Sequence, residues 1–133
     1  MLAIMANTYM SKLHQFHHEY QTWKRLLDFF KQENAFLKTR LSEVVDHNTD
    51  KDFLALAEQF QNQFIIQDEF IDELKRDIHS MEFLLKEDAL QQKNSPDKRK
   101  EAKQSKLRNE IEYLEKNFSR LKNEFNKYLI ANL

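Results

Sequence analysis

The feature that most constrains this chain is the absence of glycine from all 133 residues, with Pro96 as the only proline. Folds rich in β-strands need turn residues that accept a positive φ angle, and phosphate-binding loops need glycine where the backbone approaches the ligand. Neither requirement can be met here. The composition therefore argues against a Rossmann unit, a Walker loop and a sheet-based enzyme.

Apolar residues recur at alternating steps of four and three over three segments, which is the spacing of helices that pack side by side at shallow angles. Polar stretches rich in capping residues separate the segments at 46–50 and 94–97. We predict an all-α protein with helices over about 8–47, 50–91 and 96–131. They would form one elongated, antiparallel, up-down-up three-helix bundle over residues 1–133, with coiled-coil-like packing.

The three apolar stripes define a predicted core. Their positions are Tyr9, Leu13, Phe16, Tyr20, Trp23, Leu27, Phe30, Asn34, Leu37, Leu41 and Val44; Phe53, Ala57, Phe60, Phe64, Gln67, Ile71, Leu74, Ile78, Met81 and Leu85; and Leu107, Ile111, Leu114, Phe118, Leu121, Phe125 and Tyr128. We call these the seam positions.

Asn34 and Gln67 are the only amides among the seam positions. A polar side chain in a helical core costs stability unless it finds a partner, and it can define the register. We predict that Asn34 and Gln67 contact each other as a buried polar register pair. The alternative is that one or both are hydrated at a loose layer.

Charge is distributed unevenly along the chain, although the net charge is only −1. Residues 49–92 contain four Lys or Arg against eleven Asp or Glu, whereas residues 93–133 contain eleven against six. An acidic second helix followed by a basic third helix favours their antiparallel pairing through flanking charges.

One end of the predicted bundle lacks apolar cover, because Lys98–Lys106 contributes no large apolar seam residue. The facing ends of the first two helices form a candidate interaction surface, consisting of Tyr9, Met10, Leu13, Phe16, Tyr20, Met81, Leu84 and Leu85. The N-terminal hexapeptide, whether ordered or not, is one segment that could cover it. The aliphatic stems of Lys100 and Lys103 are another. The third alternative is a second chain, either another copy or a different protein.

A second apolar stripe lies beside the seams. It comprises Leu26, Phe29 and Phe36 in the first helix and Leu56, Ile66 and Phe70 in the second. One interpretation is a widened core face, because each helix of a three-helix bundle contacts two neighbours. The other interpretation is a lateral dimer face.

Two polar clusters suggest chemistry. His14 and His18 are spaced as a helical chelate, with His17 nearby, but the register turns them away from the core. The basic stretch 98–108 could contact phosphates, although no aromatic residue interleaves with it to stack on a base. We predict no metal site at the histidines, and we expect the basic stretch to pair with the acidic helix.

Two segments, Trp23–Phe29 and Phe60–Gln67, resemble small uncharacterised all-helical bacterial proteins. The resemblance implies a cytoplasmic helical bundle and no particular activity. In shape, the predicted architecture is similar to a spectrin-type three-helix repeat, and a shared shape does not carry function.

We therefore expect a non-enzymatic protein–protein interaction or scaffold bundle, with no catalytic residues and no cofactor. Its partner would be a second copy or another protein. The alternatives are a bundle that binds a metal or small ligand, and weak nucleic-acid binding through 98–108. No segment approaches the roughly 18 apolar residues of a membrane span, so we expect no membrane partner and a cytoplasmic location.

Overall fold

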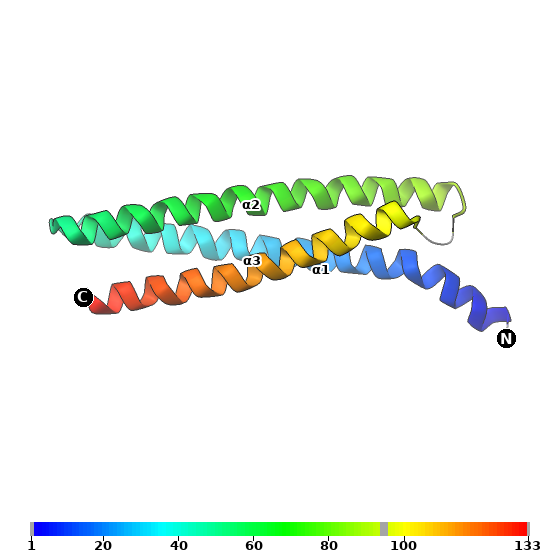
Figure 1. Ribbon diagram of the computed structural model, residues 1–133, viewed down its shortest axis with the longest axis horizontal. Coiled ribbons are helices and arrows are strands. Elements are labelled where there is room, and N and C mark those ends of the chain that lie inside the picture. Colours follow the sequence, from blue (N-terminus) through cyan, green and yellow to red (C-terminus); the bar gives the residue numbers. More distant parts are fainter. Residues whose placement is uncertain (1, 94–95, 133) are drawn as a thin grey trace. The chain divides into compact units, whose positions relative to one another are not determined.

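The protein consists of three helices: α1 (Leu2–Val45), α2 (Lys51–Leu90) and α3 (Lys98–Ala131) (Figure 1). The computed structural model describes the backbone of residues 2–93 and 96–132, and the side chains of 12–93 and 96–132. No strand occurs within these ranges. The predicted all-α three-helix bundle is confirmed.

Helix boundaries differ from the prediction mainly at the start of α1, which begins at Leu2 instead of near residue 8. The segment before Asn7 consists of good helix formers without a breaker, so the helix continues through the predicted cap. The other two helices begin at the predicted stretches 46–50 and 94–97, although α3 starts at Lys98 after an Asp97 cap and not at Pro96. The Asp50 carboxylate accepts a hydrogen bond from the Asp52 N–H (3.0 Å), and the Asp97 carboxylate accepts one from the Lys100 N–H (2.8 Å).

The end of α2 is closed by a Schellman motif. The Lys93 N–H donates to the Asp88 carbonyl (2.9 Å), and the Gln92 N–H donates to the Ala89 carbonyl (3.1 Å). Gln92 has a φ angle of 59°, in the left-handed region that glycine normally occupies at this place. A residue with a Cβ atom adopts this conformation at a cost of about 1 kcal/mol.

The helices contribute to two compact units. The first unit consists of Met1–Leu27 and Glu73–Ile111, and the second of Asp28–Asp72 and Glu112–Leu133. Each unit contains a segment of α1, α2 and α3.

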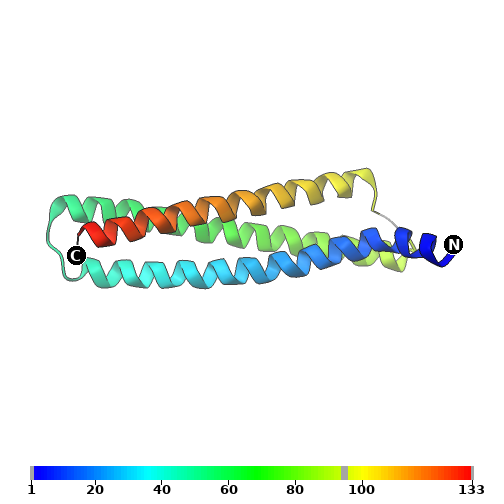
Figure 2. The same ribbon diagram turned by 90° about the horizontal axis from the view of Figure 1, so that it is seen from below.

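In the second unit, the contacts define the helix directions. Lys31 pairs with Asp72 and Lys38 with Asp68, so α1 and α2 are antiparallel. The Tyr128 hydroxyl donates to the Phe53 carbonyl (2.8 Å), which agrees with the place of the end of α3 beside the start of α2 in Figures 1 and 2. Five rings form an aromatic cluster at this end, with neighbouring ring centroids as close as 4.8 Å: Phe53, Phe60, Phe64, Phe125 and Tyr128.

In the first unit, ion pairs flank the core on two sides. Lys24 pairs with Glu82 across α1 and α2 (2.7 Å), and Glu19 pairs with Arg108 across α1 and α3 (2.7 Å). Between them lie buried seam residues such as Tyr20 and Ile78. Over both units, the buried apolar side chains are seam positions, and Pro96 and Leu129 are the additions among the described residues.

Asn34 and Gln67 are both buried in the second unit, but their amides do not bond to each other. Asn34 Nδ2 donates to the Phe64 carbonyl and to Asp68 Oδ1, both at 2.8 Å. The side-chain oxygens of Asn34 and Gln67 have no hydrogen-bond partner among the described residues. The Asp68 carboxylate, one residue beyond Gln67, is therefore the hydrogen-bond partner of Asn34 that we predicted Gln67 to be. An ionised acceptor bonds an N–H more strongly than an amide oxygen does.

Asp68 is the centre of a small network, since Lys38 and Asn34 donate to it and Lys31 lies 3.5 Å away. Burial by itself raises the pKa of Asp68. The hydrogen bonds from Lys38 and Asn34 and the charges of Lys38 and Lys31 outweigh burial and lower the pKa below its usual value of 3.8.

The substitution Asp68→Asn should lower the free energy of unfolding by about 1–2 kcal/mol at neutral pH. A carboxylate with a lowered folded-state pKa stabilises the fold above the unfolded pKa, and this stabilisation is lost as the pH falls through the folded pKa. Urea titrations should therefore show the difference at pH 7 and its disappearance in strong acid. Glu69→Gln, at an exposed position, is the control. A pH-independent difference would contradict the assignment.

The substitution Gln92→Gly should raise the free energy of unfolding by about 0.5–1 kcal/mol, because glycine adopts the left-handed conformation without steric cost. Thermal unfolding monitored by circular dichroism measures the change. Gln91→Gly, at the adjacent position, should have no stabilising effect. Equal effects of the two variants would show that the Schellman motif does not limit stability.

Candidate interaction surface

The predicted interaction surface is largely closed in the first unit. Phe16, Tyr20 and Met81 are buried, whereas Leu13, Leu84 and Leu85 are only partly exposed. The side chains of Tyr9 and Met10 lie outside the described residues. Three of the eight residues of the candidate surface are therefore covered within the chain, which leaves Leu13, Leu84 and Leu85 as its partly exposed members.

Two polar residues that continue the seam spacing beyond its apolar positions provide part of the cover. Asp88 and Gln104 are 2% and 0% exposed, so they extend the stripes of α2 and α3 beyond the apolar residues. Lys100 Nζ lies 2.6 Å from Asp88 Oδ1, and the Lys100 side chain is only 17% exposed. This contact agrees with the alternative that a lysine stem covers the apolar end. Continuing the steps of four and three past Leu85 and before Leu107 would have identified both polar positions.

Glu19 joins this polar layer from α1. It accepts hydrogen bonds from Arg108 Nε (2.9 Å) and Nη2 (2.7 Å), and from Gln104 Nε2 (3.3 Å). Burial by itself raises the pKa of Glu19, and the hydrogen bonds from Arg108 and Gln104 more than offset it, so the pKa is lowered. The layer ties α1 to α3 at the end where apolar contacts are sparse.

Tyr20 lies in the same unit with its hydroxyl buried. Burial, followed by the charges of Glu19 and Glu82, raises the pKa of Tyr20 well above its usual value. The hydroxyl has no hydrogen-bond partner among the described residues. Tyr20 is therefore a neutral core residue across the physiological pH range.

The substitution Lys100→Met should lower the free energy of unfolding by about 2–4 kcal/mol, because it leaves the Asp88 carboxylate buried with only the more distant Lys93 nearby. Chemical denaturation measures this loss, and Lys98→Met at an exposed position is the control. The double variant Asp88→Leu, Lys100→Met should recover most of the loss. A destabilised double variant would mean that the ion pair has a role beyond neutralising Asp88.

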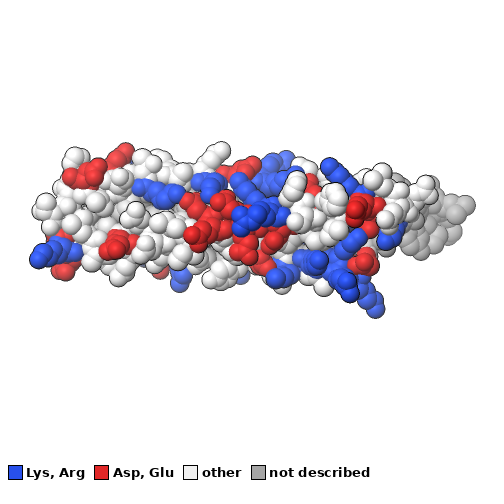
Figure 3. Space-filling model, turned by 90° about the horizontal axis from the view of Figure 1, so that it is seen from above, with Lys and Arg blue, Asp and Glu red and all other residues white. Residues whose placement is uncertain are grey.

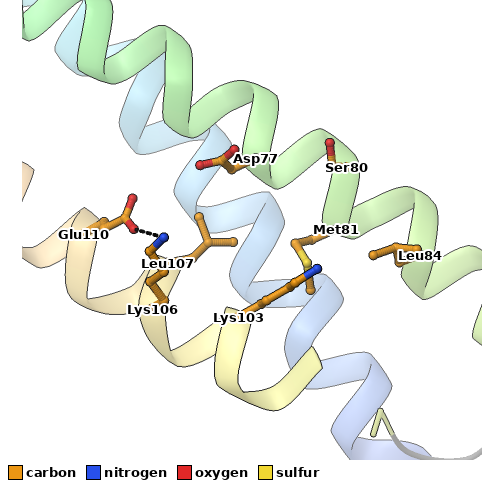
Figure 4. A pocket seen from close by; sticks show the side chains of 8 residues that line it. All are labelled: Asp77, Ser80, Met81, Leu84, Lys103, Lys106, Leu107 and Glu110. Atoms are coloured by element: carbon orange, nitrogen blue, oxygen red, sulfur yellow. Dashed lines mark ion pairs between the residues drawn. The ribbon is translucent and has the colours of Figure 1, made fainter. Parts of the chain in front are cut away.

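A groove remains open between α2 and α3 in the first unit (Figure 4). It has a volume of about 220 Å³ and is lined by Asp77, Ser80, Met81, Leu84, Lys103, Lys106, Leu107 and Glu110. Met81 and Leu107 are buried and form an apolar floor, and Leu84 is partly exposed. Two members of the predicted surface, Met81 and Leu84, therefore line this groove.

The charges around the groove separate along its length. Because α2 and α3 are antiparallel, Asp77 lies opposite Glu110 at one end, and Leu84 lies opposite Lys103 at the other (Figure 4). Lys106 pairs with Glu110 on the same helix (3.7 Å). With Lys106 paired there, the end at Asp77 and Glu110 keeps one negative charge, whereas Lys103 makes the other end basic; the two ends are two helical turns, or about 10 Å, apart.

The second apolar stripe is exposed, which contradicts the interpretation as a widened core. Phe29 and Phe36 are 52% and 61% exposed, and Leu56 and Ile66 are also exposed. Leu26 and Phe70 are half-buried, and Phe70 makes an edge-to-face contact with Tyr113. The seams already fill the core, so Phe29, Phe36, Leu56 and Ile66 stay outside it.

The polar clusters show little sign of the predicted alternatives. His14, His17 and His18 are exposed, and the described residues contain no group of three or more His, Cys, Asp or Glu that could bind a metal ion. In the basic stretch, Lys100, Lys106 and Arg108 each pair with a carboxylate. On the face shown in Figure 3, basic and acidic side chains lie next to one another.

No known protein family, curated protein or solved structure matches the chain. The resemblance to small helical bacterial proteins therefore stays a prediction. In the described part of the chain, no helix combines the length and the apolar character that crossing a membrane would require.

Proposed function

We propose that this chain is a non-enzymatic protein-interaction bundle whose α2–α3 groove binds an amphipathic helix of another protein. The observation that carries the proposal is the groove itself, with an apolar floor of Met81 and Leu107 between ends of opposite charge. Helix-in-groove recognition uses such a floor for an apolar anchor and the charged ends for orientation. We also propose a cytoplasmic location, which rests on composition alone.

The floor defines the anchor of the partner. About 220 Å³ accommodates one large aliphatic side chain, and Leu84 at the edge adds apolar contact. Such a groove provides a small contact area, so we expect weak, transient binding. Burial of the anchor would supply most of the affinity, because exposed ion pairs contribute only about 0–1 kcal/mol each.

The charged ends of the groove define the orientation of the partner. A basic residue of the bound helix would lie over Asp77 and Glu110, and an acidic residue would lie over Lys103. These two sites are about 10 Å apart, which corresponds to a spacing of seven residues on the bound helix. The ligand we expect has arginine at i, leucine at i+3 and glutamate at i+7.

A synthetic helical peptide with this arrangement tests the proposal. Fluorescence polarisation should detect its binding with a Kd of about 1 mM or tighter. Leu84→Asp should weaken binding at least tenfold, because it places a charge beside the anchor. Leu90→Asp, at a position that is 84% exposed on the same helix, should leave binding unchanged.

A second peptide, in which arginine and glutamate change places, tests the orientation. It should bind more weakly to the original protein and recover affinity for the variant Lys103→Glu, Asp77→Lys. Absence of binding by the first peptide, or binding that Leu84→Asp does not affect, would overturn the proposal.

A further inference from the structure

A second seam lies on the outer face of α1 in the second unit, within the cyan stretch of Figure 2. Phe29, Gln32, Phe36 and Thr39 follow one another at steps of three, four and three. All four are exposed and uncharged. This is the spacing of a coiled-coil seam, repeated on a face that does not belong to the core.

The neighbouring positions show which way this face points. Lys31 and Lys38 lie toward α2, where they pair with Asp68, and Glu33 lies toward α3, where it pairs with Lys122 (3.4 Å). The seam of Phe29 and Phe36 is on the remaining face of α1. An exposed phenylalanine repeated after seven residues on one face is a costly feature unless another helix covers it.

A hollow of about 260 Å³ lies on this face and is lined by Phe29, Gln32 and Glu33. Residues at i, i+3 and i+4 are three corners of the hole that receives a side chain in knobs-into-holes packing, and Phe36 at i+7 is the fourth. The same short stretch of helix therefore presents both a hole and a protruding ring.

We propose that a second copy of this chain covers the seam, with the two α1 helices antiparallel. Phe36 of each copy inserts into the hollow of the other, and Phe29 packs opposite Thr39. A two-fold axis relates the two Phe36 contacts, so both copies contribute the same residues to the interface. The exposed Ala35 lies close to the axis, where its small side chain permits a close approach of the helices.

The antiparallel orientation follows from the sizes of the facing side chains. In this arrangement each phenylalanine lies opposite a smaller or more slender side chain, Thr39 or Gln32. A parallel pair would place Phe29 against Phe29 and Phe36 against Phe36. The seam belongs to the second unit and is independent of the groove proposed to bind a partner helix.

Light scattering over a concentration series tests the association. The mass should rise with concentration from 16.2 kDa to twice that value. Phe36→Gln should weaken the dimer at least tenfold, and Ala35→Arg should do the same by keeping the helices apart. Ile66→Gln is the matched control, because Ile66 is 60% exposed, almost the same as Phe36 at 61%, and lies on another helix.

All three variants change exposed positions, so each should retain the helicity and unfolding midpoint of the original protein, as measured by circular dichroism. A constant monomer mass up to about 1 mM, a limit equivalent to roughly −4 kcal/mol, would overturn the proposal. A dimer that Phe36→Gln leaves intact, or that Ile66→Gln weakens equally, would also overturn it.

A spin label on a cysteine introduced by Ser42→Cys determines the orientation. The label attaches at this position alone, because the chain has no cysteine of its own. In the antiparallel dimer the two labels are about 24 Å apart along the helix axis, at 1.5 Å per residue. In a parallel dimer they are about 10 Å apart, the distance between packed helices. The shorter distance would overturn the antiparallel arrangement.

Discussion

The structure depends on one constraint, the burial of apolar side chains at steps of four and three on three glycine-free helices. Leu27, Ile71 and Leu114 are completely buried, and the seam residues before and after them along each helix are also buried. Burying such side chains contributes about 1.5–3 kcal/mol each. Because the spacing recurs without interruption, it specifies which face of each helix turns inward. The positions of the polar residues follow from that orientation.

Polar residues in and beside the core determine which layers pair. Asp68 connects Asn34 to Lys31 and Lys38 in the second unit, and Asp88 connects Lys100 to Lys93 in the first. A buried carboxylate tolerates few alternative positions, because leaving it without a cation costs several kcal/mol. These networks therefore disfavour shifts of one helix along another. They contribute to the choice of register as well as to stability.

The two proposed surfaces arise where the bundle leaves apolar groups outside its own core. In the first unit, the start of α3 is polar, and a groove over Met81 and Leu107 stays open. In the second unit, Phe29 and Phe36 lie on a face of α1 that no described helix covers. A bundle of three helices can bury only one side of each helix, so any further apolar stripe is available to another chain.

Much of the fold could be predicted from the sequence, because helical periodicity is a local property. The seam spacing identified nearly all buried apolar residues, and the residues near 46–50 and 94–97 identified the turns. The partner of Asn34, the burial of Asp88 and the exposure of Phe36 could not be derived in this way. Each depends on how far side chains reach between helices that are distant in sequence. The sequence by itself determined which face of each helix turns inward, since that requires only the spacing along one helix. Only the tertiary structure decided which polar groups meet and which apolar groups stay exposed, since those outcomes depend on the packing of all three helices.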